Sequence, residues 1–174
     1  MVNIVCFMGG ACGDIVTAVI DPKDAQLDGN RIKLPLHRQL LKKPHLYKKD
    51  SAKNEYIDFI SNNYKSIPSH DTDFHIRNNH KFITIEVNDI DIGMWAAERF
   101  QKLHSPHVWD EMMKASNYKT VKDYAQALID HKTLISPNAD MCIDLKDIVD
   151  GKIQNYFDID EKSKVFYQQW LNSQ

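Results

Sequence analysis

The stretch VNIVCFM at residues 2–8 decides the fold, together with FITIEV at residues 82–87. Both are rich in β-branched residues, which favour extended backbone. The first is apolar over almost its whole length and ends at two glycines, which is typical of a strand buried on both faces of a parallel sheet. We therefore expect residues 2–8 to form a central strand of a mainly parallel sheet, with residues 82–87 beside it or one strand away.

Helical spacing of apolar residues marks most of the remaining chain. We expect helices over 15–20, 34–41, 52–64, 91–104, 106–115, 121–131, 145–149 and 160–172, and a short strand over 141–144. The spacing within 15–20 also permits a strand. Because strands alternate with helices, the sequence predicts one α/β domain over residues 1–174, with three layers and a mainly parallel sheet.

Length and composition exclude several classes of protein. The chain has 174 residues, of which 43% are hydrophobic and 26% charged, as in ordinary globular domains. It has no apolar run of the roughly 20 residues that a membrane helix needs, and we expect no membrane partner. The formal net charge of −2 gives no support for nucleic-acid binding. Three cysteines and no basic leader favour a reducing, cytoplasmic location.

Positive charge is concentrated in residues 22–50. This segment has eight Lys and Arg residues against three acids, and it holds three of the six prolines. It is therefore predicted to be an irregular excursion at the surface. Two interpretations stay open: the segment is a solvated basic surface, or it folds over an anionic ligand bound nearby.

The glycine-rich stretch GGACGD at residues 9–14 follows the first predicted strand. A strand, a glycine turn and a helix can seat a phosphate, because backbone N–H groups converge at the helix N-terminus. The stretch lacks the Gly-Lys-Ser/Thr ending of nucleoside-triphosphatase loops; Asp14 follows Gly13 instead, and its charge would repel a phosphate. Thr17 is the nearest hydroxyl. The loop is predicted to be either an anion site or a tight turn in which Asp14 caps the helix.

Histidines and aspartates gather just before the second predicted strand, at His70, Asp71, Asp73 and His75. His and Asp are suitable metal ligands, but their spacing here matches no recognised metal motif, so we predict no metal. His70 alone could serve as a general base on a substrate hydroxyl. Turn hydrogen bonds are the structural alternative, and a metal-assisted hydrolase is the remaining catalytic one.

The order of these features resembles the sulfotransferase family, which has a P-loop-like fold. Residues 8–17 resemble its 5′-phosphate loop and following helix, and residues 67–70, ending at His70, resemble the segment that carries its catalytic base. Residues 83–91 resemble its next strand, with Asn88 and Asp91 matching the motif that follows, and residues 143–151 resemble its last segment. The family arginine for the 3′-phosphate falls at Val87, and the loop lysine has no counterpart. A cation from residues 31–49 would have to replace it.

This resemblance implies a nucleotide-dependent sulfuryl or phosphoryl transferase that acts on a small hydroxyl acceptor. His70 would be the base, and a 3′-phosphoadenosine-type nucleotide would be the cofactor. The residues expected to hold this cofactor are Gly9, Gly10, Gly13, Asp14, Thr17 and Asn88. The alternative is a catalytically degenerate protein that binds a phosphorylated or sulfated small molecule, or a protein partner.

Overall fold

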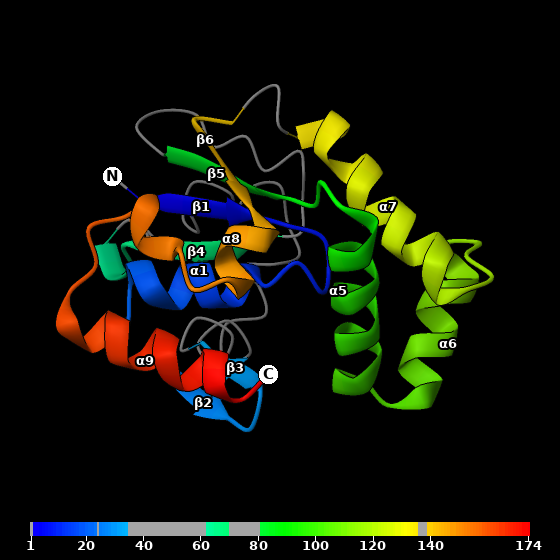
Figure 1. Cartoon of the computed structure of the whole chain (residues 1–174), viewed down its shortest axis with the longest axis horizontal. Coiled ribbons are helices and arrows are strands. Elements are labelled where there is room, and N and C mark those ends of the chain that lie inside the picture. The colour runs from blue at the N-terminus through cyan, green and yellow to red at the C-terminus, as the bar shows by residue number, and fades with distance from the viewer. Residues whose placement is uncertain (1, 24, 35–61, 70–80, 136–138) are drawn as a thin grey trace.

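A four-stranded parallel sheet forms the centre of the structure (Figure 1). The computed structural model describes residues 2–23, 25–34, 62–69, 81–135 and 139–174. The strands are β1 (Asn3–Cys6), β4 (Ser66–Ser69), β5 (Lys81–Glu86) and β6 (Met141–Asp144). Their order is β4-β1-β5-β6, and every pairing is parallel. Residues 2–8 thus supply a central strand and residues 82–87 its direct neighbour, as the sequence predicted.

Branched apolar side chains meet in register across this sheet. Val5 is paired with Ile83, and Ile85 with Ile143. Val5, Ile83 and Ile143 have no exposed surface, and they belong to one hydrophobic core that also includes residues of the helices. Burying such side chains is the main favourable contribution to the stability of the sheet.

Helices follow the expected segments closely. They are α1 (Gly13–Ile20), α5 (Ile90–Leu103), α6 (Pro106–Ala115), α7 (Val121–Ile135), α8 (Leu145–Val149) and α9 (Glu161–Asn172), with a 3₁₀ turn over Ile153–Asn155. Residues 15–20 are therefore helical and not extended. Side-chain caps explain several starts: Asp89, Ser105 and Asp160 each accept backbone N–H groups at the head of a helix.

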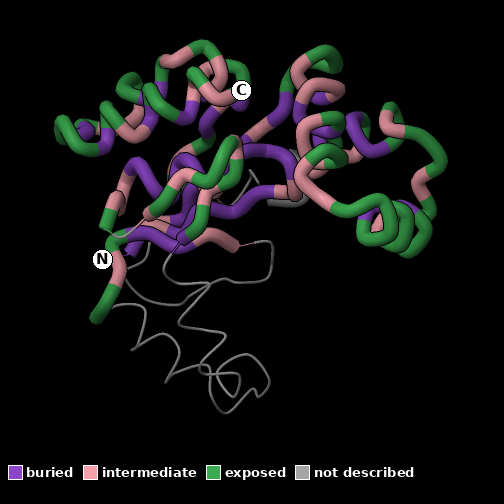
Figure 2. The backbone as a smooth tube through the Cα atoms, turned by 90° about the horizontal axis from the view of Figure 1, so that it is seen from below, coloured by how far each residue is buried: buried purple, intermediate pink, exposed green. Residues whose placement is uncertain are grey.

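The helices form two groups around the sheet. α1 and α9 lie together on one side, and α5, α6 and α7 gather beyond the carboxyl ends of β1 and β5 (Figure 1). Buried positions follow the strands and the inner sides of these helices (Figure 2). The arrangement is an α/β fold consistent with three layers. Among the described residues, no helix has the length and apolar character to cross a membrane.

A β-hairpin occupies part of the segment that was predicted to be irregular. β2 (Gln26–Asp28) pairs with β3 (Arg31–Lys33) in antiparallel fashion, and Gly29 adopts a left-handed φ of 58° at the turn. Each strand has only three residues, with one apolar side chain at the centre. A segment of this length is too short to show the alternation that identifies a strand in sequence. Of the helix expected at 34–41, only Leu34 is described, and it lies outside any helix; most of the helix expected at 52–64 also falls outside the described residues.

The strand order has a reversal that matters for function. From β1 the chain passes to β4 on one side, and it then returns to β5 on the other side of β1. In open α/β sheets, ligands bind in the crevice outside the carboxyl ends of the strands at such a reversal. The glycine stretch begins just beyond the carboxyl end of β1, at this place in the fold.

Candidate functional site

The glycine stretch forms a tight turn between β1 and α1. The N–H of Ala11 donates to the carbonyl of Met8 at 3.0 Å, and that of Ile15 donates to the carbonyl of Cys12 at 3.1 Å. From α7, the Tyr124 hydroxyl donates to the carbonyl of Gly9 at 2.9 Å. The turn is therefore fixed by its own backbone and by a neighbouring helix.

At each glycine of the turn, neighbouring atoms leave no room for a side chain. A Cβ at Gly13 would lie 1.8 Å from the Phe7 ring, and one at Gly9 would lie 2.5 Å from the Phe100 ring. Gly10 has a φ of 91°, which L side chains rarely adopt, and its Cβ would lie 2.8 Å from the Ala96 carbonyl oxygen. Close packing alone accounts for these glycines, in agreement with a tight turn. The expected cap was wrong, because Cys12 is the N-cap residue of α1 and Asp14 is its second helical residue.

Two residues predicted to contact the cofactor form hydrogen bonds within the protein. Thr17 is 3% exposed, and its hydroxyl donates to the carbonyl of Gly13 at 2.9 Å. The Asn88 amide, just beyond the end of β5, donates to the carboxylate of Asp144, the last residue of β6, at 3.1 Å. Neither side chain lines the cavity described next.

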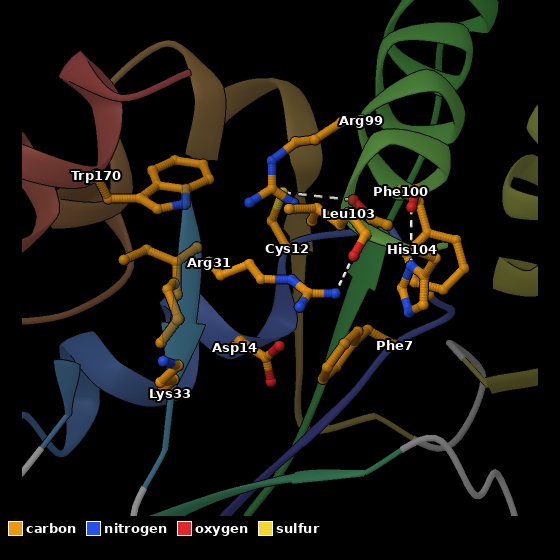
Figure 3. A pocket seen from close by; sticks show the side chains of 14 residues that line it. Phe7, Cys12, Asp14, Arg31, Lys33, Arg99, Phe100, Leu103, His104 and Trp170 are labelled. Atoms are coloured by element: carbon orange, nitrogen blue, oxygen red, sulfur yellow. Dashed lines mark hydrogen bonds between the residues drawn. The ribbon is translucent and has the colours of Figure 1, made fainter. Parts of the chain in front are cut away.

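A cavity of about 300 Å³ adjoins the glycine turn (Figure 3). The turn, the end of α5, the β2–β3 hairpin and α9 contribute its walls. It is lined by Phe7, Gly9, Gly10, Cys12, Asp14, Ile15, Arg31, Ile32, Lys33, Arg99, Phe100, Leu103, His104 and Trp170. Of the predicted cofactor residues, the structure thus brings Gly9, Gly10 and Asp14 together here.

The cavity is rich in positive charge. Arg31, Lys33 and Arg99 line it together with His104, and Asp14 is the one carboxylate among the described residues of its lining. Arg31 and Lys33 belong to the hairpin, so the basic segment does fold toward the glycine turn as one interpretation required. Whether a ligand lies beneath it stays a prediction.

Hydrogen bonds from the two arginines attach the hairpin to α5. Arg31 donates to the carbonyl of Leu103, and Arg99 donates to the carbonyl of Asn30 at 2.8 Å. Arg99 also donates to the Gln174 side chain. Among the described residues, neither guanidinium forms an ion pair with a carboxylate, whereas Lys33 pairs with Asp28 at 2.5 Å. Within the described ranges, the charge of both arginines is therefore not compensated by a direct ion pair.

Trp170 from α9 also lies at this cavity, with its indole N–H buried. Trp170 has no exposed surface, and its Nε1 has no hydrogen-bond partner in the part of the chain that the structure describes. Figure 3 shows this nitrogen on the edge of the ring that faces the Arg31 side chain, and the Arg99 guanidinium lies 5.6 Å from the ring centroid. A buried N–H without an acceptor costs about 1–3 kcal/mol. Because this nitrogen has no exposed surface, a group in the cavity does not reach it in this arrangement.

The Cys12 thiol is not a nucleophile at neutral pH. Burial raises its pKa to about 11; the charge of Asp14 adds to this, and that of Arg99 opposes it. The thiol is therefore protonated, and its Sγ lies 3.4 Å from the carbonyl oxygen of Gly10 as a weak donor.

His70 and the other residues of the histidine and aspartate cluster lie outside the described residues. β4 ends at Ser69, whose carbonyl accepts the N–H of Phe7 at 3.1 Å. The segment before His70 thus ends at the same sheet edge as the glycine turn. Within the described ranges, no group of three His, Cys, Asp or Glu residues could hold a metal ion.

Sequence reasoning missed Arg99, His104 and Trp170. They come from the end of α5 and from α9, far from the glycine turn in sequence, and no local pattern distinguishes them from other helical residues. Comparison with known proteins finds no matching family model, no similar curated protein and no similar solved structure. The resemblance to sulfotransferases therefore rests on the sequence motifs alone.

Gly13→Ala should destabilise the protein, because the new Cβ would enter the space of the buried Phe7 ring. Overpacking of this kind costs about 1–3 kcal/mol. We expect urea unfolding to show this loss in an otherwise normal protein. In a Phe7→Leu background, which removes the ring, the same Gly13→Ala change should cost less. An equal cost in both backgrounds would show that the two positions are not coupled.

Alkylation should distinguish the exposed Cys142 from the buried Cys12. With iodoacetamide at pH 8, peptide mass spectrometry should find Cys142 modified in the folded protein and Cys12 unmodified. Because a pKa of about 11 keeps the Cys12 thiol protonated, raising the pH to 9 should not change this. Urea should expose Cys12 to the reagent. Rapid modification of Cys12 in the folded protein would contradict its assigned burial and pKa.

Proposed function

We propose that the protein binds a phosphorylated small molecule in the cavity beside the glycine turn. The observation that carries this proposal is the pair Arg31 and Arg99, which line one cavity and have no carboxylate partner among the described residues. Lys33 adds a third cation. Guanidinium groups match the geometry of phosphate oxygens and bind them with two parallel hydrogen bonds.

The surrounding groups support an anion in this position. α1 begins beside the cavity, and a helix N-terminus carries roughly half a positive charge. The volume of about 300 Å³ is at the lower end of the range for small-molecule sites, which favours a compact phosphate ester. A 3′-phosphoadenosine-type nucleotide is the phosphate ester that the sulfotransferase resemblance suggests, and it is larger than the compact esters that this volume favours.

Sulfuryl or phosphoryl transfer to a hydroxyl acceptor is the catalytic extension of this proposal. It requires a base, and His70 directly follows Ser69 at the end of β4. A base at this edge of the sheet would serve an acceptor placed above the glycine turn. The degenerate-binding alternative is favoured by the lack of a loop lysine and by Val87, which is 1% exposed and cannot bind a phosphate.

Phosphate binding should depend on the cations of the cavity. Inorganic phosphate, adenosine monophosphate and adenosine 3′,5′-bisphosphate should be tested by thermal shift and calorimetry. At least one should raise the melting temperature of the wild-type protein. Lys33→Gln and Arg31→Gln should each weaken its binding about tenfold, since a charged hydrogen bond contributes about 1.5–3 kcal/mol.

Lys102→Gln is the matched control, because Lys102 is exposed on α5 and does not line the cavity. It removes the same charge as Lys33→Gln and should leave binding nearly unchanged. The proposal fails if none of the three compounds stabilises the protein, or if Lys102→Gln weakens binding as much as Lys33→Gln does.

His70→Ala tests the catalytic extension. With 3′-phosphoadenosine 5′-phosphosulfate and a panel of small phenols and alcohols, we expect slow formation of the sulfated acceptor by the wild-type protein. The substitution should abolish this turnover and leave ligand-induced stabilisation largely intact, because a base acts on the acceptor and not on the donor. Stabilisation without turnover in the wild-type protein would instead support the degenerate-binding alternative.

A further inference from the structure

One histidine lies among the cations of the cavity. His104 lines it together with Arg31, Lys33 and Arg99. It is the C-cap residue of α5, and it is half-buried. Histidine is the side chain whose charge ordinarily changes between about pH 5 and 8, whereas lysine and arginine stay charged over this range. The number of positive charges around the cavity can therefore change by one at His104.

A hydrogen bond of the imidazole ring determines which of its nitrogens can meet a ligand. The Nδ1 atom of His104 lies 2.8 Å from the carbonyl oxygen of Phe100, one turn earlier in α5. Because a carbonyl only accepts, Nδ1 carries a hydrogen and donates it. The other nitrogen, Nε2, then has a lone pair in the neutral ring and an N–H in the charged ring.

The Nε2 atom of His104 is accessible. In Figure 3 it lies at the end of the ring away from the Phe100 carbonyl. Among the described residues no group bonds to it, and it is not one of their buried side-chain atoms without a partner. The Phe100 ring packs against the imidazole with 4.2 Å between the two centroids, which limits rotation of the imidazole. An ordered and accessible nitrogen thus lies beside the cations.

Two opposing influences act on the charged form of His104. The C-terminal end of a helix carries a partial negative charge, which stabilises a cation at the end of α5. Arg31, Lys33 and Arg99 repel a further positive charge in the same lining. An anion among these cations offsets their repulsion. By linkage, an anion in the cavity and a proton on His104 should each strengthen the binding of the other.

Asp14 and Cys12 are the remaining titratable side chains among the described residues of the lining. Burial raises the pKa of Cys12 to about 11, so this thiol stays neutral below pH 8. Protonation of Asp14 would also favour an anion by removing a negative charge. A substitution at His104 leaves Asp14 in place, so it separates the two effects.

We propose that His104 contacts the bound anion and makes anion binding in this cavity depend on pH. In the charged ring, the Nε2–H donates to a ligand oxygen as a fourth cationic group. In the neutral ring, the Nε2 lone pair faces the ligand oxygen and disfavours it. This inference rests on the proposed function and adds regulation of the same site by protons. Anion binding should therefore strengthen as the pH falls.

Sulfate is the probe, because it stays doubly charged between pH 5.5 and 8, whereas phosphate takes up a proton in this range. In calorimetry with the wild-type protein, we expect sulfate to bind at least about fivefold tighter at pH 5.5 than at pH 8, the lower end of usual couplings between two sites. Titrations at pH 6.5 in two buffers of different ionisation enthalpy should show a net uptake of protons by the protein.

His104→Asn is the test variant, because its amide can keep the hydrogen bond to the Phe100 carbonyl while Nε2 is lost. Both the pH dependence and the proton uptake should nearly disappear in it. His107→Gln is the matched control, since His107 is exposed on α6, pairs with Glu111 at 3.3 Å and does not line the cavity. It should behave as the wild-type protein does. Circular dichroism and melting temperatures check folding, and His104→Gln replaces His104→Asn if the latter does not fold.

The outcomes separate this inference from the proposed function. If sulfate, inorganic phosphate and the two adenosine phosphates all fail to bind the wild-type protein at either pH, the proposed function is wrong and this inference falls with it. If only phosphates bind, the same comparison is made with inorganic phosphate, whose own protonation is common to wild type and variant. Binding that does not depend on pH, or an unchanged proton uptake in the His104 variant, overturns this inference alone. Loss of the uptake in His107→Gln would overturn it as well.

Discussion

The contact between the Phe7 ring and the Cα of Gly13 is the constraint on which the functional end of the molecule depends. A Cβ at residue 13 would lie 1.8 Å from the ring, so the chain can leave β1 and enter α1 within a few residues only if that position is glycine. The short turn places the first residues of α1 beside the end of the central strand. It also holds Cys12 and Asp14 against the space that α5 and the hairpin enclose.

Elements with their own periodicity were predictable from the sequence. The strand at 82–87 was predictable from its alternation, and the helix at 106–115 from its helical spacing and the Ser105 cap. These signals are local in sequence, and the tertiary contacts of both elements agree with them. The β2–β3 hairpin was not. Its strands carry Leu27 and Ile32 as their sole apolar positions, and its pairing is stabilised by docking against α5 through arginine hydrogen bonds that no local pattern encodes.

Some residues of the candidate site could likewise be predicted from the sequence, and others could not. The glycines and the excess of cations in the hairpin segment are local in sequence, so a basic segment near the glycine turn could be foreseen. Arg99 and Trp170 could not, because their role follows from the packing of α5 and α9 around the end of β1. From the sequence, either an anion site or a tight turn could explain the glycines. The structure shows that close packing by Phe7 and Phe100 explains them without a ligand, so the case for anion binding moves to the arginines.

The hydrogen bonds of Arg31 and Arg99 between the hairpin and α5 also affect how a ligand would bind. Arg31 and Arg99 are already ordered by backbone carbonyls, so a ligand would not have to meet the full entropic cost of immobilising two long side chains. The same hydrogen bonds attach the hairpin to α5. A ligand oxygen that draws a guanidinium away from its carbonyl would therefore loosen one wall of the cavity unless it also bridges to the other wall. A phosphate group, with several oxygens around one centre, can bridge in this way, whereas a halide offers one small centre without directional acceptors. This arrangement of Arg31 and Arg99 thus favours polyatomic oxyanions over monatomic anions of equal charge.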